Sequence, residues 1–287
     1  MPKLDSSSLI DVQPGLTNWR RWPMRWDYGT GLIDIQRGLT SWRTWSMLAW
    51  NDIRRRYRRS SLGQFWLTLS MAMTIGGLGF VYSHLFRTDV TSYLPYLAVT
   101  FVSWGIISSL VNESCTAFSE NENLLRQLAL PRSIFIFRVI ARTFMVAAHN
   151  ALIIPVVFIY FGVGVNMNLL WLAVGLALVI VNGFWFGFFI AIVCARFRDV
   201  PQIVTNVMQV VFFITPVMFQ PELLPESGRS LMKWNPFANF LEVLRDPILG
   251  VQPSSWALTT CFLIAVVGFV MVVPFASRYA PRVVYWL

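Results

Sequence analysis

The sequence predicts an all-α polytopic membrane protein, and three observations support this fold class. Of its 287 residues, 56% are hydrophobic and only 13% are charged, whereas a soluble protein carries about 25% charged residues. Six stretches of about 20 or more mostly apolar residues follow one another, each long enough to cross a hydrocarbon core of about 30 Å as a helix. The formal charge of +9 comes almost entirely from arginines, which gather in alternate connecting segments.

Residues 1–30 are expected to form a cytoplasmic arm that lies on the membrane surface. They lack the apolar core of a cleaved signal peptide, so the first span is expected to act as the insertion signal. Tryptophan and arginine together favour the headgroup zone of a bilayer. The arm interleaves these two residue types at Trp19, Arg20, Arg21, Trp22, Arg25 and Trp26.

Residues 31–60 are expected to form an amphipathic interface helix that ends in a basic block. Between positions 31 and 56, apolar residues recur at helical spacing, and polar residues fall largely on the opposite face. This pattern suits a helix lying in the membrane interface, and a helix packed on a soluble partner would show it too. The apolar face comprises Ile35, Leu39, Trp42, Trp45, Ala49 and Ile53.

The basic block places five arginines within six residues, directly before the first span. Each charge at the membrane centre costs about 2.5–3.5 kcal/mol, so the block stays cytoplasmic and sets the direction of the first crossing. The absence of a linker disfavours a nucleic-acid patch. Because arginine forks bind phosphate, the block also suits a phosphate or diphosphate headgroup at a substrate entrance, a role that competes with simple topology anchoring. It comprises Arg54, Arg55, Arg56, Tyr57, Arg58 and Arg59.

Residues 61–287 are expected to form a transmembrane domain with six spans. The fifth span is the least regular, since Asn206, Gln209 and Pro216 predict a kink or the lining of a cavity. Most basic residues lie before span one, between spans two and three or four and five, or after span six. Both termini are therefore expected to be cytoplasmic. The expected spans cover 62–86, 93–117, 134–161, 169–195, 200–219 and 256–276.

Two connecting segments carry patterns of their own. The cytoplasmic segment 118–133 predicts a short helix that Pro131 stops, with Leu124, Leu125 and Leu128 on one apolar face. That face suits a groove on a soluble partner, or it rests on the protein's own bundle.

The external segment 220–253 is too apolar for a free loop and too short to span, so it predicts re-entrant or interfacial half-helices. Its notable residues are Trp234, Asn235, Pro236, Glu242 and Arg245.

Several function classes are disfavoured. A P-loop needs a lysine beside Ser or Thr in a glycine-rich setting, and neither Lys3 nor Lys233 has one. Ion relays place titratable groups within spans, and the expected spans offer two candidates, His149 and Glu113. His149 would act as a relay or would form an interhelical hydrogen bond. The external carboxylates form no compact catalytic group, and the cysteines show no metal-ligand spacing. The chain is therefore expected to be neither an enzyme nor a metalloprotein.

Aromatic residues make up 15% of the chain. Their flat apolar faces suit sugar rings without fixing one sequence, so a polymer would slide along a wall that they line. Placement at the headgroup level or toward lipid competes with this role for each of them. The channel-lining candidates are Phe65, Trp66, Tyr82, Tyr93, Tyr96 and Trp104.

The order of these parts resembles the membrane subunit of type-2 ABC exporters, and among them the polysaccharide group that exports O-antigens, capsules and teichoic acids. The resemblance covers about residues 33–287. Its departures are the arm 1–30, which has no counterpart, and Leu130, which stands where an aromatic is expected. It rests on Arg-Tyr-Arg-Arg-Ser-x-Leu-Gly-x-Phe-Trp at 56–66, Leu-Pro-Arg at 130–132, Ile-Thr-Pro-Val at 214–217, Trp-Asn-Pro at 234–236 and Glu242-x-x-Arg245.

The resemblance implies a homodimer in a bacterial inner membrane, with two copies of a separate ATPase that holds ATP and Mg²⁺. The substrate would be a lipid-linked glycan that moves outward through a channel between the two membrane subunits. A type-2 exporter of drugs or lipids is the alternative, and an integral membrane glycosyltransferase is a weaker one. The residues implied to couple the subunit to its ATPase are Glu122, Leu124, Leu125, Arg126, Leu128 and Arg132.

Overall fold

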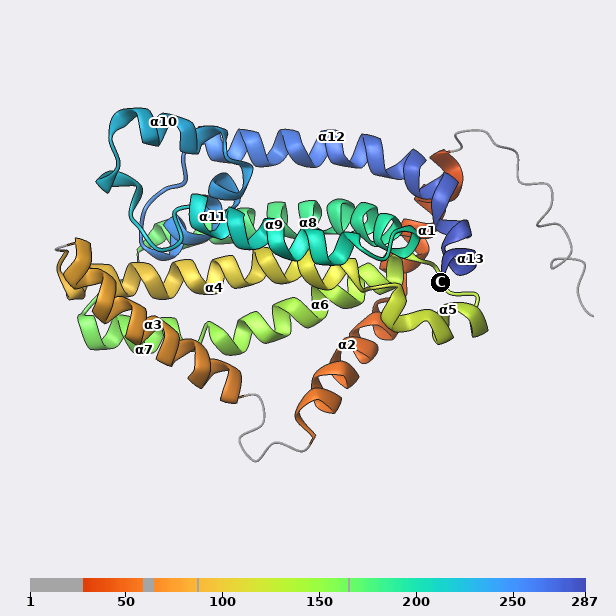
Figure 1. Cartoon of the computed structure of the whole chain (residues 1–287), viewed down its shortest axis with the longest axis horizontal. Coiled ribbons are helices and arrows are strands. Elements are labelled where there is room, and N and C mark those ends of the chain that lie inside the picture. The colour runs from red at the N-terminus through yellow and green to blue at the C-terminus, as the bar shows by residue number, and fades with distance from the viewer. Residues whose placement is uncertain (1–27, 59–64, 87, 165) are drawn as a thin grey trace, which may run out of the picture.

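The computed structural model describes residues 28–58, 65–86, 88–164 and 166–287, and within them it shows helices without strands. The long helices run side by side in a bundle (Figure 1). The surface arm predicted for residues 1–30 lies almost wholly outside the described residues. The helices are α1 (Tyr28–Thr40), α2 (Trp42–Tyr57), α3 (Phe65–Phe86), α4 (Val90–Cys115), α5 (Glu122–Gln127), α6 (Ser133–Asn150), α7 (Ile153–Phe161), α8 (Trp171–Arg196), α9 (Val200–Ile214), α10 (Glu226–Trp234), α11 (Pro236–Ile248), α12 (Ser255–Tyr279) and α13 (Val283–Trp286).

The predicted all-α membrane fold is confirmed, because five segments are long and apolar enough to span a bilayer: Phe65–Leu85, Val90–Cys115, Ser133–Phe161, Met167–Arg196 and Ser255–Trp286. They correspond to expected spans one to four and six. Expected span five is the 15-residue α9, which ends before Pro216. Thr215 is extended there, because a residue before proline is driven out of the α region. The sixth crossing stays a prediction.

The prediction of a single interface helix over 31–56 is wrong in one respect. The chain forms two helices there, separated by a break at Ser41. α1 packs against α12 and α6, whereas α2 runs along α6. Tight contacts fix α1, because a Cβ on Gly31 would collide with Ser277, and one on Gly38 with Ser133. Of the predicted apolar face, Ala49 and Ile53 are buried within the protein, whereas Leu39 and Trp42 are exposed.

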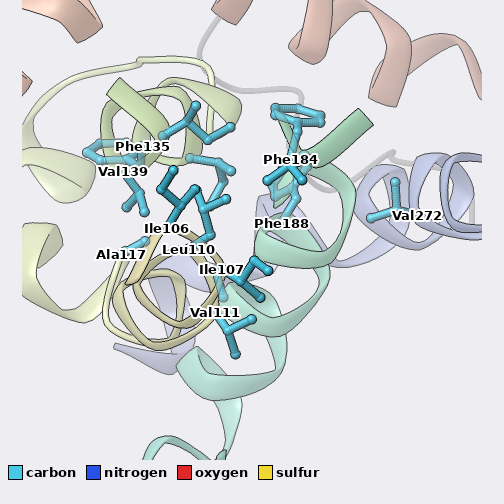
Figure 2. Packing of buried hydrophobic residues seen from close by; sticks show 14 of the residues in the cluster. Ile106, Ile107, Leu110, Val111, Ala117, Phe135, Val139, Phe184, Phe188 and Val272 are labelled. Carbon is cyan, nitrogen blue, oxygen red and sulfur yellow. The ribbon is translucent and has the colours of Figure 1, made fainter. Parts of the chain in front are cut away.

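α4 is the central helix, in contact with α3, α6, α8, α9 and α11. Its apolar side chains meet those of α6 and α8 in the main core (Figure 2). Burial of this kind stabilises a helix by close packing as much as by removal from water. The core residues labelled there are Ile106, Ile107, Leu110, Val111, Ala117, Phe135, Val139, Phe184, Phe188 and Val272.

Small residues let α8 approach its neighbours closely. A Cβ on Gly175 would strike the carbonyl oxygen of Val243 in α11, and one on Gly268 of α12 would strike the Trp185 ring. Such contacts are a common packing device between membrane helices. They hold α11 against α8 as part of the bundle.

The two ends of the bundle differ in what they carry. α1, α5 and α13 lie together at one end, and α10 lies at the opposite end (Figure 1). The segments expected to be cytoplasmic from their arginines therefore gather at one end. The segment 220–253, which the sequence predicts to be external, contains two helices, α10 and α11, and their placement relative to the bilayer stays a prediction. Asn235 caps α11, because its Oδ1 accepts a hydrogen bond from the Phe237 N–H at 3.0 Å.

Candidate functional site

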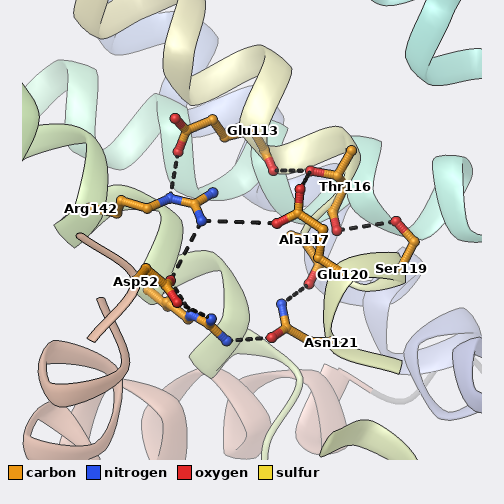
Figure 3. A network of polar contacts seen from close by, with 9 residues as sticks. Asp52, Glu113, Thr116, Ala117, Ser119, Glu120, Asn121 and Arg142 are labelled. Atoms are coloured by element: carbon orange, nitrogen blue, oxygen red, sulfur yellow. Dashed lines mark hydrogen bonds and ion pairs between the residues drawn. The ribbon is translucent and has the colours of Figure 1, made fainter. Parts of the chain in front are cut away.

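A cluster of charged and amide side chains joins four segments at the arginine-rich end of the bundle (Figure 3). Arg138 of α6 binds Asp52 of α2 with two nitrogens, of which Nε donates to Oδ2 at 2.6 Å. Its third nitrogen donates to Oδ1 of Asn121, in the turn directly before α5. One arginine therefore connects α2 to the segment that carries α5.

Arg142, one helical turn further along α6, extends the cluster to α4. Its Nε donates to Glu113 Oε2 at 2.8 Å, and its Nη1 lies 3.5 Å from Asp52 Oδ2 and 3.9 Å from Glu120 Oε2. Thr116 donates to the other oxygen of Glu120 at 2.8 Å. Two arginines are thus matched by three carboxylates.

The cluster is largely withdrawn from solvent, since the side chains of Asp52, Arg138 and Arg142 are each 13% exposed. Removing one member of a buried ion pair costs about 3–5 kcal/mol, because the partner is left as an unpaired buried charge. The pairing therefore resists separation of α2, α4, α6 and the 119–121 turn. We therefore expect these four segments to move as one unit.

Sequence reasoning missed this cluster. Asp52 counted only as part of a polar helix face, and Glu113 as an isolated charge near the end of a span. The available signal was Arg138 and Arg142 four residues apart inside an otherwise apolar segment. Charges in that position need partners, and the sequence gives no distance by which to assign them.

The predicted coupling helix is present but shorter than expected. α5 ends at Gln127 rather than at Pro131, and Leu128 is already extended. Its predicted apolar face is divided: Leu125 is buried in the main core, whereas Leu128 is 49% exposed. Leu124 packs partly against the same core, and Glu122 pairs with Arg126 at 2.8 Å on the surface.

Arg132, the last predicted coupling residue, lies where the segment enters α6. Asp34 of α1 accepts hydrogen bonds from the Arg132 and Ser133 N–H groups, both at 2.9 Å. Ser133 Oγ donates in turn to the Asp34 carbonyl at 2.7 Å. Burial lowers the pKa of the Arg132 guanidinium, and nearby Asp34 opposes that shift. A carboxylate at a helix N-terminus is also favoured by the helix dipole.

The basic block occupies the C-terminal end of α2, where arginines complement the helix dipole. Arg54, Arg55, Arg56 and Arg58 are exposed and free to meet headgroups. The side chain of Tyr57 and all of Arg59 lie outside the described residues.

The predicted channel-lining residues differ in how exposed they are. Phe65 and Trp66 are exposed, and Tyr82 packs at the edge of a smaller apolar cluster. Tyr93, Tyr96 and Trp104 are buried, contrary to a lining role on an open surface. Two of them hold the chain after α9: Tyr96 donates toward the Pro216 and Phe219 carbonyls at 2.8 and 2.9 Å, and Tyr93 donates to the Met218 carbonyl.

The residues singled out from sequence in segment 220–253 form a compact set of contacts. Arg245 is 6% exposed, with its Nε donating to Asp246 Oδ1 at 2.7 Å and its Nη1 to the Tyr96 hydroxyl at 3.1 Å. Burial raises the pKa of Asp246 to about 6, while Arg245 opposes the shift. Glu242 accepts from the Ser254 N–H at 2.9 Å, and exposed Trp234 packs edge-on against Trp256.

Comparison with known proteins decides the family. The protein-family model described as "ABC-2 type transporter" matches residues 43–249, which include the whole ion cluster. The chain belongs to the ABC-2 transporter family. Its resemblance to type-2 ABC exporters is thereby confirmed, and this ABC-2 permease is a membrane subunit whose ATP hydrolysis belongs to a separate subunit.

Named relatives share much of this permease's length. It is 23% identical over 238 residues to the O-antigen export system permease protein RfbA of Klebsiella pneumoniae, covering 80% of this chain and 90% of the relative. It is 24% identical over 206 residues to the polysialic acid transport protein KpsM of Escherichia coli, covering 69% and 78%. RfbA of Myxococcus xanthus is 24% identical over 190 residues, covering 64% and 72%.

In the part of the chain that the structure describes, no three His, Cys, Asp or Glu side chains are grouped to hold a metal ion. What the ABC-2 permease presents at this end is a set of helices joined by buried ion pairs, next to a short exposed segment. That arrangement suits the transmission of movement.

Proposed function

We propose that this ABC-2 permease exports a polysaccharide outward across the bacterial inner membrane, with both termini cytoplasmic. Two copies form the channel at their interface, and two copies of a separate ATPase, with ATP and Mg²⁺, drive it. The polymer is carried on a lipid. The substrate class rests on the relatives, which are named for O-antigen export and for polysialic acid transport.

The observation that carries the coupling part is the Arg138 bridge from Asp52 to Asn121. α5 follows Asn121 directly, and Leu128 beyond it is exposed for contact with a soluble partner. A push on this segment would reach α2 through Arg138 and α4 through Arg142, because a buried ion pair resists stretching. The ATPase is therefore proposed to act on α5 and the residues that follow it.

The exposed arginines at the end of α2 fit the start of the transport path. Lipid-linked glycans carry phosphate between lipid and sugar, and arginine binds phosphate oxygens in a fork. Arg54, Arg55 and Arg56 follow Asp52 in α2, and the Arg138 bridge joins Asp52 to the turn before α5. They would hold the phosphate at the cytoplasmic face while the glycan enters.

The test is deletion of the gene in its host, followed by restoration. Without the chain, we expect lipid-linked polymer to accumulate on the cytoplasmic side while the cell surface loses it, and restoration should reverse both changes. A normal glycan surface after deletion would contradict polysaccharide export and favour a drug or lipid exporter.

A further inference from the structure

The exposed surface of α9 is divided lengthwise into two unlike stripes. Gln202, Thr205, Asn206 and Gln209 are exposed and recur at i, i+3, i+4 and i+7, which places them on one helical face. A second exposed stripe is wholly apolar and comprises Ile203, Val207, Val210 and Ile214. Met208 lies on the inner side, buried against the bundle.

α4 continues the polar stripe. Ser108 and Asn112 lie four residues apart on the face of α4 that meets α9. Thr205 Oγ1 donates to Asn112 Oδ1 at 3.3 Å, and a hollow of about 330 Å³ lies between the two helices. We call Ser108, Asn112, Gln202, Thr205, Asn206 and Gln209 the polar track.

The track cannot face lipid at low cost. Moving an amide from water to hydrocarbon without a partner costs about 4–8 kcal/mol, and three of the four polar side chains on α9 are amides. Gln202 satisfies only part of this demand by donating to Asn206 at 3.2 Å. The apolar stripe on the same helix has no such cost. α9 therefore has one side built for hydrocarbon and another built for a polar phase.

We propose that the polar track lines the transport path and binds the hydroxyl groups of the moving glycan, an inference that rests on the proposed function. Amides and hydroxyls both donate and accept, as sugar hydroxyls do. None of the six side chains carries a charge, so the track offers no strong ion pair that would hold a polymer in place.

At the external end of the track, aromatic side chains take the place of polar ones. Phe212 and Phe213 border the same hollow, with ring centroids 5.3 Å apart, and Phe213 is exposed. Ring faces suit the apolar faces of sugars. The glycan would thus pass from hydrogen-bonding side chains to stacking side chains on its way out.

Cysteine labelling in membrane vesicles tests the track. Gln209→Cys and Asn206→Cys are compared with Val207→Cys and Ile214→Cys on the apolar stripe, using a charged methanethiosulfonate that does not enter lipid. Cys115, Cys194 and Cys261 are buried, so the unaltered chain supplies the blank. We expect track cysteines to react at least about tenfold faster, because a thiol in apolar surroundings is less ionised and out of the reagent's reach.

The occupant is tested with the same variants in cells that do or do not make the polysaccharide. Slower labelling of the track when polymer is present, with no change on the apolar stripe, would support glycan binding; equal rates would overturn it. Equal labelling of the two stripes, or none on the track, would also overturn the inference while leaving export itself intact. Loss of the proposed function would show separately, as failure of the unaltered chain to restore surface glycan.

Discussion

Arg138 of α6 and Asp52 of α2 form a two-pronged ion pair, although 86 positions separate them in the chain. Both side chains are 13% exposed, so water screens the pair weakly. Because Arg138 also donates to Asn121, this pair joins α2 to the segment that contains α5. It is the central connection of the coupling account.

Asp52→Asn removes the negative charge and leaves Arg138 and Arg142 facing each other with less compensation. We expect a loss of stability of about 3 kcal/mol, as for other broken buried pairs, together with a fall in export. Thermal unfolding of the detergent-purified protein and surface polysaccharide measure the two effects. Glu122→Gln is the matched control for stability alone, because its partner Arg126 is exposed and such surface pairs contribute about 0–1 kcal/mol. Equal losses of stability from the two substitutions would contradict a special role for Asp52.

Leu125 and Leu128 should respond differently to the same change. Leu125→Asp places a charge in the main core, so we expect little folded protein in the membrane. Leu128→Asp alters an exposed side chain, so the protein should insert in normal amount and fail to retain its ATPase on purification. Retention of the ATPase by the Leu128 variant would remove this residue from the proposed contact.

Gly175→Ala tests the close approach of α8 and α11. The added methyl would strike the carbonyl oxygen of Val243, which is backbone and cannot rotate away. We expect about 1–3 kcal/mol of destabilisation from overpacking, seen as a lower unfolding temperature. Gly76→Ala in α3 has open space around the new methyl and should be neutral or slightly stabilising. The opposite order would contradict the packing described.

Asp34→Ala removes both acceptors for the N–H groups at the start of α6. Loss of a helix cap costs about 0.5–2 kcal/mol, and we expect a decrease in that range. Asp34→Asn keeps one acceptor oxygen and should lie between the alanine variant and the unaltered protein. Unfolding temperatures of the three proteins provide the comparison, and an asparagine variant no better than alanine would contradict the capping role.

Apolar length and charge placement were enough to predict five of the long segments to within a few residues, except for the end of the last, which was expected at 276 and lies at Trp286. The cap at Asn235, with Pro236 after it, was also accessible, because this order is typical of a helix start. These features depend on neighbours in the chain. They need no knowledge of which helices meet.

Features that depend on pairing between distant segments were not accessible. Arg142 and Glu113 meet across 29 positions, and no periodicity specifies that contact. The break at Ser41 separates α1, which packs against α12 and α6, from α2, which runs along α6, and no local pattern specifies these contacts. Likewise, Leu125 and Leu128 look alike in sequence, and only packing buries the first and exposes the second.

Transport in inside-out vesicles tests the central claim most directly. Vesicles containing this chain, its ATPase and lipid-linked polysaccharide are given ATP and then a glycan-cleaving enzyme from outside. The account predicts that the polysaccharide becomes protected inside the vesicles, and that protection requires both ATP and this chain. Polysaccharide that stays fully cleavable, with the ATPase bound and active, would contradict the assignment of this chain as the exporter's membrane subunit.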